Sequence, residues 1–247
     1  MSRRLQGILF DLGDTILNFG KVDVHMLFEA GARRAHDYLK EIGQPVPSLA
    51  RFHRRQFWAI RWSYFISHFT RREFNSLDLM TQISHKMGQD LTREQAEELA
   101  WKWYEPLSEH ATVEPGTRDM MQAILEKGLT VGIVSNTFLP GSVLDRHLAQ
   151  ENLLEFFPLR VYSCDVGYRK PSRRIFRKAL REAKLDAGCT FFVGDSLRAD
   201  VEGSFRAGMI PVWKASTDRD MAPPAHARHV ITELTQLNDL VEEYLPG

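Results

Sequence analysis

The sequence has few cysteines, no long apolar run and no excess of charge of either sign. Its two cysteines, Cys164 and Cys189, are too few and too widely spaced for a disulfide framework or a Cys-x-x-Cys metal site, which favours a reducing compartment. No apolar stretch approaches the ~20 residues of a transmembrane helix. The short apolar run near the start meets Asp11 too early for a signal peptide. We therefore expect a cytoplasmic globular protein that does not enter a membrane.

The charges balance, because 32 Lys and Arg residues are matched by 32 Asp and Glu residues. Chains that bind nucleic acid or acidic membranes usually carry an excess of positive charge, so neither partner is expected here. With 247 residues, of which 43% are hydrophobic, the chain is long enough for one large domain or two smaller ones. Nothing in the composition indicates an oligomeric state.

Short apolar runs without alternation predict strands that are buried on both faces, as in a parallel sheet. The first run is Gly7–Phe10, and the second, Leu129–Val134, follows only after a long interval. The remaining runs follow closely and are Leu159–Ser163, Thr190–Val193, Ile210–Trp213 and His229–Thr232. Helical stretches separate them, one beginning at Pro115–Thr117 and one capped by Ser172. This alternation predicts an α/β fold with a doubly wound parallel sheet.

The long interval between the first two strands has a helical pattern throughout. Within it, Thr92–Gln95 matches a capping box that precedes an apolar helical face. We therefore predict two units in one chain. An α/β core is formed by residues 1–18 and 111–247, and an inserted all-helical domain is formed by residues 19–110.

Polar residues gather at the predicted carboxyl ends of the strands, where ligands bind in open α/β sheets. They are Asp11, Gly13, Asp14 and Thr15 after the first strand, Ser135 and Asn136 after the second, Lys170 after the third, and Asp195 and Asp200 after the fourth. Carboxylates that converge on one edge repel one another. We therefore expect a cation with oxygen ligands, Mg²⁺, among them.

In this order and spacing, the four motifs resemble those of the haloacid dehalogenase superfamily, in the subclass with a helical (C1-type) cap. The resemblance covers residues 5–20 and 110–215, and the helical interval corresponds to the cap. It implies a Rossmann-like parallel sheet core with an inserted helical cap domain. It also implies a Mg²⁺-dependent phosphatase that hydrolyses a small phosphorylated metabolite.

The resemblance implies a role for each matched residue. Asp11 would attack phosphorus and form an aspartyl-phosphate, and Lys170 would orient Asp11 and neutralise the charge that develops. Ser135 and the Asn136 amide would bind the phosphoryl oxygens. The expected Mg²⁺ ligands are Asp11, the main-chain oxygen of Gly13, Asp195 and Asp200, the last directly or through water.

One position departs from the superfamily pattern. Its phosphatases usually carry a second Asp two residues after the nucleophile, as general acid and base, but this chain has Gly13 there and Asp14 one place later. Such a group contributes ~10²–10⁴-fold to the rate. Three readings remain open. In the first, Asp14, a cap side chain or water replaces the missing general acid and base. In the second, the substrate has a good leaving group, such as an acyl or anomeric sugar phosphate. In the third, the reaction is not phosphate ester hydrolysis.

Two other functions also remain open. A 2-haloacid dehalogenase would use the aspartate as a nucleophile on carbon without a metal, but the pair Asp195 and Asp200 would oppose binding of an anionic haloacid. A non-catalytic binding protein would account for Gly13, but it has no need to keep Asp11, Lys170 and Asp195 together.

A basic and aromatic segment of the predicted cap is a candidate for substrate contact. Between residues 42 and 72 there is no Asp or Glu. The segment carries Arg51, Phe52, Arg54, Arg55, Phe57, Trp58, Arg61, Trp62, Tyr64, Phe65, Phe69, Arg71 and Arg72. Either the aromatic side chains pack the helical bundle while the arginine stems cover it, or at least one of these residues contacts an anionic or ring-bearing substrate.

Overall fold

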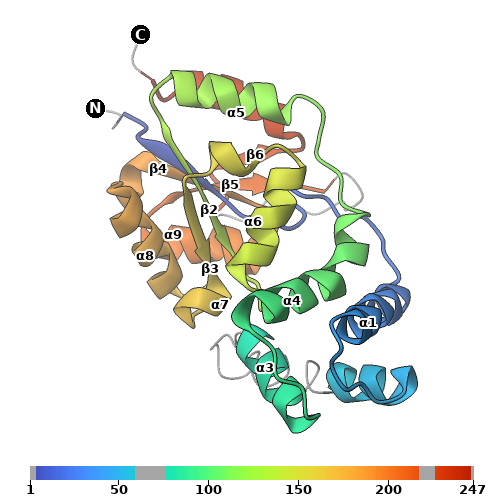
Figure 1. Ribbon diagram of the computed structural model, residues 1–247. Helices are drawn as coiled ribbons and strands as arrows, with labels where there is room; N and C mark the ends of the chain where they lie inside the picture. The colour runs from blue at the N-terminus through green and yellow to red at the C-terminus, as the bar shows by residue number, and fades with distance from the viewer. Residues whose placement is uncertain (1–3, 59–75, 217–225, 246–247) are drawn as a thin grey trace.

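The computed structural model describes residues 4–58, 76–216 and 226–245 (Figure 1). Within these ranges, six parallel strands form one sheet in the order β3-β2-β1-β4-β5-β6. The strands are β1 (Gly7–Phe10), β2 (Thr130–Ser135), β3 (Leu159–Tyr162), β4 (Thr190–Gly194), β5 (Ile210–Lys214) and β6 (His229–Ile231). The predicted doubly wound parallel sheet is confirmed, and each strand lies close to the apolar run that predicted it.

The central strand β1 is the point at which the strand order reverses. The chain passes from β1 to β2 and β3 on one side, and then to β4, β5 and β6 on the other. Phe10, at the end of β1, pairs with Ile133 of β2 and Val193 of β4. Parallel strands in this register bring their carboxyl ends to one edge, which is where ligand crevices form in such sheets.

Helices cover both faces of the sheet through two separate apolar layers. Because successive strand residues point to opposite faces, Ile8 and Phe10 pack into one layer and Leu9 into the other. The helices are α5 (Thr117–Glu126), α6 (Gly141–Gln150) and α10 (Leu237–Glu242) on the first face, and α8 (Arg173–Ala183) with α9 (Gly203–Ala207) on the second (Figure 1). The short segments are η1 (Leu154–Phe156), α7 (Ser163–Val166), η2 (Ala187–Cys189), the π-helical η3 (Leu197–Glu202) and η4 (Leu234–Gln236).

Between β1 and α5, the described part of the chain forms a helical unit. Its elements are α1 (Val24–Glu41), a helix that begins at residue 49, α3 (Ser76–Lys86) and α4 (Arg93–Ser108). Asp23 caps α1, and the predicted capping box of Thr92 and Gln95 is confirmed at the start of α4. α1 packs along α4, which also contacts α6 of the core. No helix in the described ranges is long and apolar enough to cross a membrane.

The two segments that join the helical unit to the sheet run side by side. The main chains of Asn18 and Thr112 form an antiparallel bridge. Each N–H donates to the carbonyl oxygen of the other residue, with a nitrogen-to-oxygen distance of 2.8 Å. The chain therefore leaves the core and returns to it along two adjacent segments, joined at Asn18 and Thr112.

The basic and aromatic segment falls only in part within the described residues. Arg61, Trp62, Tyr64, Phe65, Phe69, Arg71 and Arg72 lie outside them. Of the remainder, Phe52 is fully buried and packs against His36 and Trp103. This side chain therefore packs the helical unit, the first of the two roles considered for the segment. Trp58 is 61% exposed.

Candidate active site

Three of the predicted site residues meet in a buried ion cluster at the carboxyl edge of the sheet. Lys170 Nζ lies 2.7 Å from Asp11 Oδ1 and 2.7 Å from Asp200 Oδ1. The side chains of Lys170 and Asp200 are each 1% exposed, and that of Asp11 is 13% exposed. Charges so nearly excluded from water need close partners of opposite sign, and this cluster provides them.

The main chain of Lys170 is fixed by the side chain of Asn136. The Lys170 N–H donates to Asn136 Oδ1 at 2.7 Å, and Asn136 Nδ2 donates to the Lys170 carbonyl oxygen at 3.1 Å. The peptide bond between Lys170 and Pro171 is cis. Both polar ends of the Asn136 side chain are therefore bound to Lys170, which leaves the main-chain N–H of Asn136 for the predicted contact with a phosphate.

Asp11 follows β1, and the contacts of its carboxylate are made by Oδ1. Its N–H donates to the Val193 carbonyl oxygen at 2.8 Å, which extends the pairing of β1 with β4. Asp11 Oδ1 accepts the Leu12 N–H at 2.7 Å, in addition to the ion pair with Lys170. Ser135 ends the neighbouring strand β2 and is 5% exposed.

Asp195 completes a group of three carboxylates. Ligand oxygens of Asp11, Asp195 and Asp200 all lie within 4.8 Å of one another. The main chain of Asp195 is held from β5, because Trp213 Nε1 donates to its carbonyl oxygen at 3.0 Å. Three carboxylates thus surround a single ammonium group in this cluster, so negative charge is in excess.

Asp200 approaches this group from the π-helical segment η3, over the backbone of Gly194. A Cβ built on Gly194 would lie 2.5 Å from Asp200 Cγ, so only glycine permits the approach. Asp200 Oδ2 accepts the Ser196 N–H at 2.9 Å. The cap of η3 is Ser196, whose hydroxyl accepts the Ala199 N–H, so Asp200 does not cap this segment.

The loop after Asp11 turns sharply at Asp14, which has a φ of 54°. Asp14 Oδ1 accepts the Phe19 N–H at 3.2 Å, and the Asp14 N–H donates to the Leu17 carbonyl oxygen at 2.8 Å. The Asp14 carboxylate therefore stabilises the turn and is not part of the three-carboxylate group. Gly13 faces the edge of the Phe19 ring, 3.6 Å from where its Cβ would be.

Comparison with known proteins places these features in a family. The family model described as haloacid dehalogenase-like hydrolase matches residues 5–208. The chain belongs to the haloacid dehalogenase-like hydrolases. In agreement with this, human haloacid dehalogenase-like hydrolase domain-containing protein 3 is 30% identical, with an alignment that covers 100% of both chains. The superfamily predicted from the sequence is confirmed.

Two further proteins resemble the chain, one over part of its length and one in both sequence and structure. Pyrimidine 5'-nucleotidase YjjG of Escherichia coli is 28% identical over 55% of this chain and 59% of its own length. The matched part thus spans less than two thirds of that relative. The crystal structure of an HAD phosphatase from Thermococcus onnurineus is 25% identical, with a TM-score of 0.61, and the match covers 96% of this chain and 98% of that one.

In this haloacid dehalogenase-like hydrolase, the pKa values of two carboxylates of the cluster, Asp195 and Asp200, are raised above those of free aspartates. Burial, with repulsion from Asp11 and Asp14, raises the pKa of Asp195 to about 6. Complete burial and repulsion from Asp11 also raise the pKa of Asp200. Burial lowers the pKa of Lys170, but the carboxylates of Asp11 and Asp200 raise it by more, so the lysine stays protonated. Burial is the larger cause of both shifts at the aspartates, and repulsion between the neighbouring carboxylates adds to it.

Sequence reasoning missed two charged residues beside this haloacid dehalogenase-like site. Lys214, at the end of β5, is buried and forms an ion pair with Glu114 in the segment that returns from the helical unit. No local pattern distinguishes either residue from a solvated surface charge.

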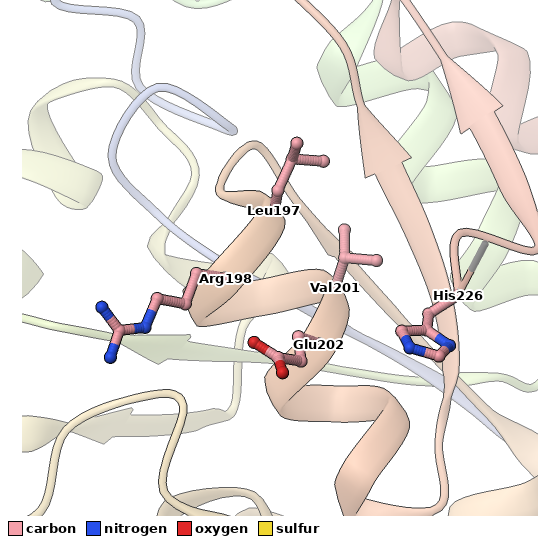
Figure 2. A pocket seen from close by; sticks show the side chains of 5 residues that line it. All are labelled: Leu197, Arg198, Val201, Glu202 and His226. Carbon is pink, nitrogen blue, oxygen red and sulfur yellow. The ribbon is translucent and has the colours of Figure 1, made fainter. Parts of the chain in front are cut away.

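Two cavities lined by described residues lie beside the carboxylate group and not within it. One, of about 290 Å³, lies on the outer side of η3 between Leu197, Arg198, Val201, Glu202 and His226 (Figure 2). The other, of about 410 Å³, is polar and lies between α3 and α4 on one side and α6 and β3 on the other. Asp11, Asp195 and Asp200 line neither cavity.

Proposed function

We propose that this protein is a Mg²⁺-dependent phosphatase that hydrolyses a small phosphorylated metabolite through an aspartyl-phosphate on Asp11. The observation that supports this proposal most is the Asp11 carboxylate, held 2.7 Å from a buried lysine beside two further carboxylates. A carboxylate that attacks a phosphate dianion needs positive charge at the reacting centre. The Escherichia coli relative is a pyrimidine 5'-nucleotidase, an activity of the same chemical kind.

The contacts of Asp11 indicate which of its oxygens attacks. Oδ1 is engaged by Lys170 Nζ and by the Leu12 N–H. Oδ2 is therefore the free nucleophile. In the proposed reaction it forms the bond to phosphorus in line as the bond from phosphorus to the leaving oxygen breaks, and water then hydrolyses the acyl phosphate. Ser135 and the Asn136 N–H would hold the phosphoryl oxygens.

The donor set of the site suits Mg²⁺. It consists of oxygens, and the three carboxylates outnumber the lysine. Repulsion between these carboxylates adds to burial in raising the pKa of Asp195 and Asp200, and a bound cation would relieve it. Asp11, the Gly13 carbonyl and Asp195 would hold the ion. Asp200 would act through water, because both of its oxygens already contact Lys170 or Ser196. When bound, Mg²⁺ would neutralise phosphoryl charge during transfer.

The missing acid at Gly13 favours substrates whose leaving group needs little protonation. Asp14 could replace it only by giving up its hydrogen bond from the Phe19 N–H, because its carboxylate closes the turn. We therefore favour acyl or anomeric sugar phosphates, whose leaving oxygen is a weak base. The helical unit, residues 19–110, would act as the cap and move about the Asn18 and Thr112 bridge, with residues 1–18 and 111–247 as the core.

Phosphate release from acetyl phosphate and p-nitrophenyl phosphate, with Mg²⁺ or EDTA, tests this proposal. We expect release that requires Mg²⁺ in the wild type and disappears in Asp11→Asn. Asp119→Asn, which changes an exposed aspartate in the first turn of α5, is the matched control and should keep full activity. No release from either substrate at any Mg²⁺ concentration would refute the proposal.

The same preparations distinguish the two alternative functions. Chloride release from 2-chloropropionate without metal, lost in Asp11→Asn, would identify a dehalogenase. Absence of both activities, with no binding of Mg²⁺, would favour a non-catalytic binding protein. The excess of negative charge in the cluster argues against the first alternative, because it repels a haloacid anion.

A further inference from the structure

Lys214 is a buried cation beside the proposed metal loop, and the reaction proposed above does not use it. Its side chain is 8% exposed, and Nζ lies 2.7 Å from Glu114 Oε1. The same Nζ donates to the main-chain carbonyl oxygen of Asp14 at 3.5 Å. A buried lysine costs desolvation free energy, which an apolar residue at the end of β5 would avoid. The position therefore calls for an explanation beyond packing.

Glu114 lies in the segment that returns from the helical unit, and it connects this lysine to Asn18 in the segment that leaves the core. Its Oε1 also accepts from Asn18 Nδ2 at 3.4 Å, and its Oε2 accepts the Leu234 N–H at 2.9 Å. Burial raises the pKa of Glu114, but its contacts with Lys214, Leu234 and Asn18 lower it by more, so the carboxylate is charged. The lysine charge is thus compensated and does not repel a cation nearby.

The carbonyl that Lys214 reaches belongs to the residue that directs the Gly13 carbonyl. The peptide plane that carries the Gly13 oxygen ends at Asp14 N, so rotation about φ of Asp14 turns that oxygen relative to the rest of the loop. Asp14 has a φ of 54°, a left-handed conformation that costs about 1 kcal/mol in a residue other than glycine. Such a conformation persists where its surroundings determine it. Here Leu17, Phe19 and Lys214 hold the three polar groups of Asp14.

We propose that Lys214 is a positioning residue which, paired with Glu114, holds the Asp14 main chain and so aims the Gly13 carbonyl at Mg²⁺. The inference rests on the metal site of the proposed function, although not on the substrate. Loss of the lysine amine frees the Asp14 carbonyl and leaves Glu114 without its closest partner. The loop can then relax from the left-handed turn, and the Gly13 oxygen moves away from the metal position.

The experiment measures Mg²⁺ binding to the intact protein by titration calorimetry, without substrate. Lys214→Met is expected to bind Mg²⁺ about 10-fold more weakly, the size of effect seen when a residue that orients a metal ligand is removed. Lys214→Arg should restore part of this loss, because it keeps the charge and the donors. In the acetyl phosphate assay, Lys214→Met should raise the Mg²⁺ concentration needed for half-maximal rate and leave kcat at saturating Mg²⁺ unchanged.

Lys127→Met is the matched control. Lys127 forms an ion pair of similar length but greater exposure, 2.6 Å from Glu242 Oε1, at the end of α5. Both variants should lose some stability, but only Lys214→Met should lose Mg²⁺ affinity. Equal Mg²⁺ affinity in the two folded variants would overturn the inference and make Lys214 a structural residue.

A second variant covers the case in which Lys214→Met does not fold. Glu114→Gln keeps the shape and the acceptor oxygen but leaves Lys214 as an uncompensated cation, so Mg²⁺ should again bind more weakly. Unchanged affinity would count against the inference. If the wild type binds Mg²⁺ but releases no phosphate, the proposed phosphatase fails while the binding measurements still decide the role of Lys214. If the wild type binds no Mg²⁺, the inference fails with the metal site.

Discussion

Replacement of Gly13 with aspartate introduces the acidic side chain that phosphatases of this superfamily usually carry, and the structure has space for it. A Cβ built on Gly13 would meet only the edge of Phe19, at 3.6 Å, which is ordinary van der Waals contact. Gly13 is also absent from the glycines with positive φ, so an aspartate can take its backbone conformation without strain. We expect Gly13→Asp to fold with nearly unchanged stability.

The size of the effect depends on the leaving group. A positioned general acid and base contributes ~10²–10⁴-fold to the rate, which corresponds to about 3–5 kcal/mol of transition-state stabilisation. An alkyl phosphate, whose leaving oxygen is strongly basic, should gain at least ~100-fold in kcat/KM. Acetyl phosphate should gain little, because its leaving carboxylate needs no proton. The added charge, near Asp11 and Asp195, should also tighten Mg²⁺ binding.

The assay compares kcat/KM for glycerol 2-phosphate and acetyl phosphate in the wild type, Gly13→Asp and Gly13→Asn. The asparagine variant has the same shape but cannot transfer a proton, so it should show no gain. Equal gains in the aspartate and asparagine variants would refute the acid–base reasoning. A wild type that already hydrolyses glycerol 2-phosphate well, and loses this in Asp14→Asn, would show that Asp14 performs the proton transfer despite its bond to Phe19.

Three further predictions concern stability and the support of Lys170. In protein freed of metal, the raised pKa of Asp195, about 6 against an ordinary 3.8, means that the native state binds the extra proton between these values. The contribution of Asp195 to the free energy of unfolding should therefore fall, by about 3 kcal/mol at most, as the pH rises from ~4 to ~7, and saturating Mg²⁺ should remove this contribution in urea titrations. Gly194→Ala places a Cβ 2.5 Å from Asp200 Cγ and should reduce the free energy of unfolding by about 1–3 kcal/mol. Gly13→Ala, whose Cβ has space, is the control and should change the free energy of unfolding little. Asn136→Ala frees the Lys170 main chain and should lower kcat by about 10-fold or more. A KM change alone would instead assign Asn136 to substrate binding.

The sheet and the meeting of the main site residues could be predicted because local patterns determine both. Apolar runs such as Gly7–Phe10 mark buried strands, and parallel strands place the residues that follow them on one edge. The close approach of Asp11, Lys170 and Asp200 follows from this topology. Lys170 could be identified only because it belongs to the motif after the third strand that resembles the superfamily. On its own, a lysine before proline is a common loop residue.

The supporting contacts could not be predicted, because they join segments whose approach only the folded chain defines. Asn136 binds the main chain of Lys170, and an asparagine at a strand end has many possible partners. Lys214 meets Glu114 only because β5 ends beside the crossing where the helical unit joins the core. The assignment of Asp14 as a turn residue similarly depends on its bond from the Phe19 N–H, which is a property of the folded loop.

Three energetically costly features lie together at the carboxyl edge of the sheet. Lys170 and Asp200 are ionisable groups with almost no access to water, and Asp14 takes a left-handed conformation. Each of these features lowers stability, and an apolar residue or a glycine in its place would avoid the loss. A protein selected only to bind a partner through its helical unit would have no reason to keep them. Their retention around one free oxygen of Asp11 therefore favours catalysis over a binding role, and it favours a reaction in which excess negative charge is compensated by a cation.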